Sequence, residues 1–160
     1  MKNFSAEIKE KLPEEEWLPS IYKKKVRAGR TRAYKLLIPK RENRAAILHT
    51  LLGIELKVGN RRIACPDLST ARYLQIFARI GCREVAVPYD ITKISTLADE
   101  LESSRHKALL LWKAATRKKS PQVKGKLRAN LIKTIRNEIK DIGAGAQMPE
   151  FNQNTKQRRN

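Results

Sequence analysis

Charged side chains at alternating positions raise the question of metal-dependent hydrolysis. Glu55 and Lys57 are separated by one residue in an alternating segment, so both are expected on one face of a strand. A carboxylate there would bind a divalent metal, and the neighbouring ammonium group would help to activate water. Asp67 and Asp90 each follow an expected strand, but N-capping of the next helix accounts for both. We assign no catalytic residue, and Glu55, Lys57 and Asp67 are candidates only for an alternative function, a divalent-metal-dependent nuclease.

Two short motifs resemble those of nucleases. The tripeptide Glu55-Leu56-Lys57 resembles the E-x-K half of the PD-(D/E)xK nuclease motif, although no aspartate precedes it in the chain. The segment Leu51-Leu52-Gly53, followed by Val58-Gly59, is similar to the helix of LAGLIDADG homing endonucleases. That family places a metal-binding acid where Val58 stands here, so this resemblance implies a relative that binds nucleic acid without cleaving it.

Metal and cofactor motifs are otherwise scarce. His49 and His106 are isolated, and the chain has no CxxC pair, phosphate-binding glycine loop or GxSxG motif. These absences argue against ATPases, zinc fingers and serine hydrolases. Cys65 and Cys82 are too few for a disulfide framework or a four-cysteine zinc site, and we expect buried, reduced thiols in a cytoplasmic protein. No metal site and no cofactor are expected.

Net charge gives the strongest functional signal. The 160 residues include 35 Lys and Arg against 16 Asp and Glu, a formal net charge of +19. Repulsion among so many cations destabilises a folded chain, and a polyanion is the usual partner that makes such a surface useful. We therefore predict a protein that binds nucleic acid, either DNA or RNA.

The basic residues are concentrated in three places. The segment 17–32 carries six of them and no acid, and its centre is expected to be a flexible arm that becomes ordered on phosphates. A pair of arginines lies beside the Gly59-Asn60 turn, and a final helix has one cationic face. The predicted nucleic-acid-binding residues are Lys23, Lys24, Lys25, Arg27, Arg30, Arg32, Arg61, Arg62, Lys118, Lys119, Lys124 and Arg128.

Hydrophobic periodicity predicts an α+β fold. Strands are expected at 33–39, 54–58, 61–65 and 84–88, with Gly59-Asn60 as a hairpin turn. Helices are expected at 41–52 and from Asp67 or Ser69 to Ile80. This order, β-α-β-β-α-β over residues 33–88, predicts a ferredoxin-like core with one four-stranded antiparallel sheet.

Further helices are expected on both sides of that core. A short helix is expected at 5–11, before the basic arm. A long helix is expected after Asp90, with Ser103-Ser104 as the place where it could break. The expected organisation is a short helix plus arm (1–32), an α/β core (33–117), a basic amphipathic helix (118–143) and a disordered tail (144–160).

The final helix suggests a third function. Its apolar stripe from Val123 to Ile142 could pair with a second copy, which would make the protein a helix-mediated assembly protein. No membrane partner is expected, because the longest apolar run, Ala108–Trp112, is far too short to cross a bilayer. The first twelve residues also lack the apolar core of a secretory signal.

Overall fold

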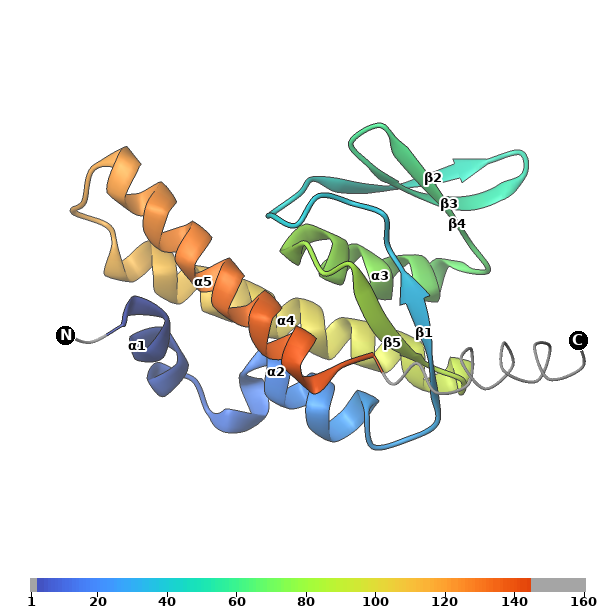
Figure 1. Ribbon diagram of the computed structural model, residues 1–160, viewed down its shortest axis with the longest axis horizontal. Coiled ribbons are helices and arrows are strands. Elements are labelled where there is room, and N and C mark those ends of the chain that lie inside the picture. The colour runs from blue at the N-terminus through green and yellow to red at the C-terminus, as the bar shows by residue number, and fades with distance from the viewer. Residues whose placement is uncertain (1–2, 145–160) are drawn as a thin grey trace, which may run out of the picture.

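Three long helices form the framework of the computed structural model, which describes residues 3–144 (Figure 1). They are α3 (Leu68–Ile80), α4 (Ile91–Ala115) and α5 (Pro121–Ile142). Helix α3 packs against α4, and α5 crosses both of them. The mixture of helices and strands confirms the expected α+β class.

Local capping signals set the ends of these helices, as the sequence predicts. The Asp67 carboxylate accepts a hydrogen bond from the Thr70 amide at 2.7 Å, and Ser120 caps α5 in the same way. Helix α3 ends at Gly81, whose φ of 90° lies in the left-handed region that glycine adopts without strain. Each cap satisfies backbone groups that would otherwise lack a partner at a helix end.

Helix α4 runs without the break considered near Ser103-Ser104. The buried Ser104 hydroxyl donates a hydrogen bond to the Glu16 carbonyl at 2.5 Å. This bond ties the middle of the helix to an N-terminal turn. A serine is accommodated there because its hydroxyl has a partner outside the helix.

The strands form two small antiparallel sheets. One pairs β1 (Thr31–Lys35) with β5 (Glu84–Pro88), so that Ala33 lies opposite Ala86. The other is a meander of β2 (Ala45–Thr50), β3 (Gly53–Val58) and β4 (Arg61–Cys65). Figure 1 shows the meander lying over α3, with which all three of its strands are in contact.

The helix predicted over residues 41–52 is wrong, because strand β2 occupies 45–50. Ala45 lies opposite the buried Val58, and Ile47 lies opposite the buried Leu56. Pairing with β3 outweighs the helical preference of this alanine- and leucine-rich segment. Gly53, expected to end a helix, has a φ of 127° and instead closes the β2–β3 hairpin behind two fully exposed leucines, Leu51 and Leu52.

The ferredoxin-like order is not confirmed. Its first helix is a strand, and the five strands lie in two sheets rather than in one sheet of four. The first strand is also displaced, since β1 occupies 31–35 instead of 33–39. Leu36 and Ile38 follow β1 and remain buried, so the apolar pattern that suggested the strand fills the core without continuing the sheet.

The N-terminal segment is ordered rather than a flexible arm. It forms α1 (Phe4–Lys11), a 3₁₀ turn η1 (Glu14–Glu16), α2 (Leu18–Ile21) and a π-helical turn η2 (Tyr22–Val26). The prediction failed because Trp17, Tyr22 and Val26, which flank the three lysines, are at most 1% exposed and anchor the segment in the core.

One buried cluster joins all these elements. It combines side chains of the N-terminal helices, both sheets, α3, α4 and α5. The rings of Tyr22 and Tyr73 lie 5.6 and 5.1 Å from that of Phe77. Ala144, the first residue of the expected tail, is buried, and residues 145–160 lie outside the described part of the chain.

The apolar stripe of α5 is largely covered by this chain itself. Leu131, Ile132, Ile135 and Ile139 are each at most 2% exposed and belong to the core cluster. Helices α1, α2, α3 and α4 all contact α5. Val123, at the beginning of the stripe, is 40% exposed. The residues proposed for pairing with a second copy are therefore mostly used within the monomer.

Candidate nucleic-acid interface

Two arginines and two tyrosines lie together on the two-stranded sheet, and we call them the arginine–tyrosine face: Arg30, Arg32, Tyr34 and Tyr89. Arg32 and Tyr34 project from the same side of β1, two residues apart. Tyr89 follows β5, and its amide donates to the Arg30 carbonyl at 3.1 Å, which extends the pairing of the two strands by one step.

The guanidinium groups of this face lie against the tyrosine rings. Arg32 is 4.9 Å from the ring centre of Tyr34 and 5.9 Å from that of Tyr89, and Arg30 is 5.6 Å from Tyr89. Arg32 also donates a hydrogen bond to the Tyr34 hydroxyl at 2.7 Å. Within residues 3–144 neither arginine forms an ion pair with a carboxylate, so both keep their charge free for an external anion.

Arg27, the third arginine predicted from this region, is less accessible. Its guanidinium lies 3.5 Å from the Thr31 hydroxyl, and its buried Nε has no hydrogen-bond partner among the described residues. Arg27 therefore lies under the beginning of β1 rather than on the open face.

The three consecutive lysines have different surroundings. Lys24 pairs with Glu14 at 3.2 Å and Lys25 pairs with Glu100 at 2.9 Å, whereas Lys23 is exposed. Glu16 pairs with Lys107 of α4. One acid of η1, Glu14, thus pairs with the basic segment that follows it, whereas Glu16 pairs with α4.

The arginines of the β3–β4 hairpin are separate from the arginine–tyrosine face, because they belong to the other sheet. Arg61 donates to the Leu37 carbonyl at 2.9 Å, and Arg62 pairs with Glu55 at 3.3 Å. Lys57 is exposed next to Arg62 in the neighbouring strand. These cations form a second, smaller basic area.

The remaining predicted cations lie at the far end of the long helices. Lys118 and Lys119 are exposed in the connection between α4 and α5. Lys124 is half-buried, and its carbonyl accepts a hydrogen bond from the Trp112 indole. Arg128 lies 4.9 Å from the Trp112 ring centre and is turned into the molecule. The predicted binding residues are thus distributed over several surfaces.

The carboxylates considered for catalysis do not come together. Glu55 pairs with Arg62, while Asp67 and Asp90 accept hydrogen bonds from the Thr70 and Thr92 amides. Capping lowers the pKa of Asp90 through its hydrogen bonds to Thr92. In residues 3–144 no group of three or more His, Cys, Asp or Glu side chains is placed to hold a metal ion. No observation therefore favours the nuclease alternative.

Sequence reasoning missed a cavity at which four arginines meet, which we call the arginine cavity. Its volume is about 450 Å³, and Arg44, Arg79, Arg105 and Arg128 line it together with Glu42. These arginines come from the segment before β2, from α3, from α4 and from α5. No local pattern could reveal them, because only the tertiary fold brings four distant segments together.

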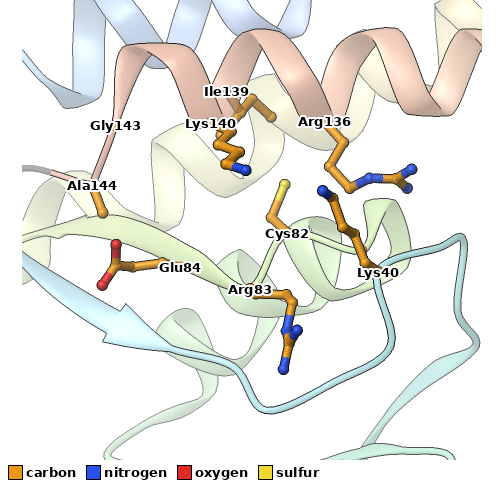
Figure 2. A pocket seen from close by; sticks show the side chains of 10 residues that line it. Lys40, Cys82, Arg83, Glu84, Arg136, Ile139, Lys140, Gly143 and Ala144 are labelled. Atoms are coloured by element: carbon orange, nitrogen blue, oxygen red, sulfur yellow. The ribbon is translucent and has the colours of Figure 1, made fainter.

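A second missed cavity, of about 250 Å³, lies between α5 and the beginning of β5. Figure 2 shows the Cys82 thiol pointing towards α5, with the end of Lys40 beside Arg136 on one side of it and Lys140 on the other side. Burial raises the pKa of Cys82 to about 12, so its thiol is protonated at neutral pH. The Glu84 carboxylate lines the same cavity and partly balances the positive charges of the lysines and arginines there.

In the described part of the chain, no helix has the length and apolar character that crossing a membrane requires. Searches of family models, curated proteins and solved structures gave no significant match to this chain.

Proposed function

We propose that the protein binds nucleic acid, with the arginine–tyrosine face as its principal contact surface. The observation that carries the proposal is the placement of Arg30 and Arg32 over the rings of Tyr34 and Tyr89, with no carboxylate paired to either arginine within residues 3–144. Guanidinium groups donate to phosphate oxygens, and aromatic rings stack on unpaired bases.

This combination favours a single-stranded or locally unpaired ligand. Stacking requires bases that are not enclosed in a duplex, and Tyr89 is 43% exposed, which leaves ring surface for a base. Guanidinium groups held over rings add planar surface for stacking as well as charge. A duplex would use the arginines but leave the tyrosine rings without a role.

Free cations outside the arginine–tyrosine face would contact phosphates further along a longer strand. Lys23, Lys118 and Lys119 are exposed and form no ion pair with the described residues, so each can neutralise a phosphate without breaking an internal contact. Lys24 and Lys25 would first have to leave Glu14 and Glu100. We therefore expect the first group to contribute more to affinity than the second.

Fluorescence anisotropy with labelled single-stranded DNA and RNA tests the proposal. The double variant Arg30→Gln/Arg32→Gln is expected to bind at least about tenfold more weakly at low salt, since each phosphate contact is worth a substantial share of the affinity. The control Arg72→Gln/Lys107→Gln removes the same two charges from residues already paired with Asp99 and Glu16.

The control separates this face from net charge. An equal loss in both double variants would show that total charge rather than the arginine–tyrosine face holds the ligand. Wild-type protein that binds neither DNA nor RNA at low salt would remove the proposal altogether.

A further inference from the structure

The arginine cavity contains more positive charge than its own carboxylate can balance. Four arginines line it, and Glu42 is the single acidic side chain among its lining residues. Arg128 donates to both oxygens of Glu42, at distances between 2.6 and 3.1 Å. Arg79 has a weaker contact, 3.8 Å, with Glu102. Glu42 is thus committed mainly to one of the four arginines.

Arg105 is the group left without adequate compensation. Its side chain is 16% exposed, and its nearest carboxylate oxygen, on Glu42, is 3.9 Å away. Its buried Nε has no hydrogen-bond partner in the described structure. Burial and the neighbouring Arg79 lower the pKa of Arg105, which means that its surroundings disfavour the charged form. A largely buried cation whose one ion pair spans 3.9 Å, and whose Nε has no hydrogen bond, is costly and points to a missing anion.

We propose that the arginine cavity binds a phosphate group. A guanidinium group presents planar donors that match the oxygens of phosphate, and arginines arriving from four segments can reach several of those oxygens together. Arg44 is exposed at the mouth, whereas Arg105 is largely buried, so the anion enters past Arg44 and reaches Arg105. This inference is independent of the proposed nucleic-acid contact on the two-stranded sheet.

Glu42 limits the affinity of this site. Its carboxylate already pairs with Arg128 and lies 3.9 Å from Arg105. It therefore fills part of the space that phosphate would occupy and neutralises part of the positive charge that would attract it. Removing its negative charge raises the net charge of the lining side chains from +3 to +4, counting four arginines and one glutamate. Glu42→Gln should therefore strengthen phosphate binding, whereas loss of an arginine should weaken it.

The test measures the binding of inorganic phosphate in two ways, by calorimetric titration and by thermal unfolding. Chloride keeps the ionic strength constant in both. Phosphate is expected to raise the midpoint of wild-type unfolding, because a ligand of the folded state stabilises it. Arg105→Gln and Arg44→Gln are each expected to weaken phosphate binding about tenfold, and Glu42→Gln to strengthen it several-fold.

Arg79→Gln is also expected to weaken phosphate binding. Arg72→Gln is its matched control, since both arginines lie on α3 and pair with acids of α4, but only Arg79 lines the cavity. Arg72→Gln is expected to leave phosphate binding unchanged. Because Arg44 is exposed, Arg44→Gln keeps the test valid if a buried substitution impairs folding.

Oligonucleotides with a 5′-phosphate or a 5′-hydroxyl then distinguish the source of the group. Displacement of inorganic phosphate by the 5′-phosphorylated strand alone would assign the cavity to a strand end. Displacement by neither would assign it to free phosphate. The proposal is overturned if phosphate stabilises the protein no more than chloride does, or if it stabilises the Arg44→Gln and Arg105→Gln variants as much as the wild type.

Discussion

The hydroxyl of Tyr22 donates a hydrogen bond to the carbonyl of Gly143 at 2.8 Å, although 121 residues separate them in the chain. The same oxygen accepts a hydrogen bond from the Ala86 amide at 2.9 Å. One phenol therefore joins the π-helical turn, strand β5 and the end of α5. Removing the hydroxyl would leave the Ala86 amide without an acceptor in the core and would take the donor from the Gly143 carbonyl.

Tyr22→Phe is expected to lower the free energy of unfolding by about 2–4 kcal/mol, because a buried donor and a buried acceptor both lose their partner. Urea denaturation followed by circular dichroism measures this change. Tyr89→Phe, which alters an exposed ring, serves as the control and should stay within about 0.5 kcal/mol of wild type. Equal stabilities of Tyr22→Phe and wild type would contradict the assigned bonds.

Alkaline pH should destabilise the protein, because two buried groups hold their protons more tightly in the folded state than in the unfolded state. Burial raises the pKa of Tyr22 and of Cys82 to about 12, from ordinary values of 10.0 and 9.0. The folded state therefore holds protons that the unfolded state releases, so stability is retained below about pH 9 and falls as pH rises towards 12. Each such group contributes a slope of about 1.4 kcal/mol per pH unit within its window.

Denaturation curves recorded between pH 8 and 11 check this dependence. Tyr22→Phe should be less sensitive to pH above 10, because it lacks one of the groups whose ionisation favours unfolding. A free energy of unfolding that stays constant over this range would be inconsistent with the buried positions of both side chains.

Gly81→Ala should be strongly destabilising. Gly81 has a φ of 90°, and a Cβ atom there would lie 2.6 Å from the backbone nitrogen of Arg41. Strain and steric overlap with a neighbouring backbone together predict a loss of about 3 kcal/mol. Gly125→Ala makes the same chemical change inside α5, in open space, and should instead stabilise by about 0.5–1 kcal/mol. Thermal unfolding of both variants would reveal the opposite signs.

Salt dependence should separate the two components of the arginine–tyrosine face. Arg30→Gln is expected to reduce the slope of log affinity against log salt by roughly one unit, because one phosphate contact is lost. Tyr89→Ala should weaken binding by about 1–3 kcal/mol while the slope stays the same, since stacking releases no counterions. Anisotropy titrations at several salt concentrations measure both quantities. A changed slope in Tyr89→Ala would mean that the ring acts by positioning Arg30 and Arg32.

Elements defined by local signals could be predicted from the sequence. Asp67, Ser120 and Gly81 mark helix ends, and the Gly59-Asn60 turn marks the β3–β4 hairpin. Strand β2 could not be predicted, because its stability depends on pairing with β3 rather than on its own residues. For a similar reason, lysines 23–25 predict a mobile arm by their charge alone. The burial of the side chains that flank them, which depends on the rest of the fold, holds the segment in place.

The candidate sites likewise combine features that the sequence predicts with features that depend on the tertiary fold. Arg30 and Arg32 were identified from their charge, but their contact with Tyr89 depends on the pairing of β1 with β5, more than 50 residues later. No local sequence pattern predicts the arginine cavity, because four separate segments of the chain contribute its side chains. Charge composition thus predicts the class of partner that we propose, while only the fold suggests where that partner would be held.

The attachment of the N-terminal helices to α5 has a consequence for biosynthesis. Ser5 bonds to Asn130, Trp17 to Glu138 and Tyr22 to Gly143, so these three hydrogen bonds form only after the end of α5 has been synthesised. At about 5–20 residues per second, roughly 6–24 s of translation separate these segments. During that interval α5 does not yet cover the N-terminal helices, and chaperones that recognise apolar surface would meet the nascent chain before its core closes.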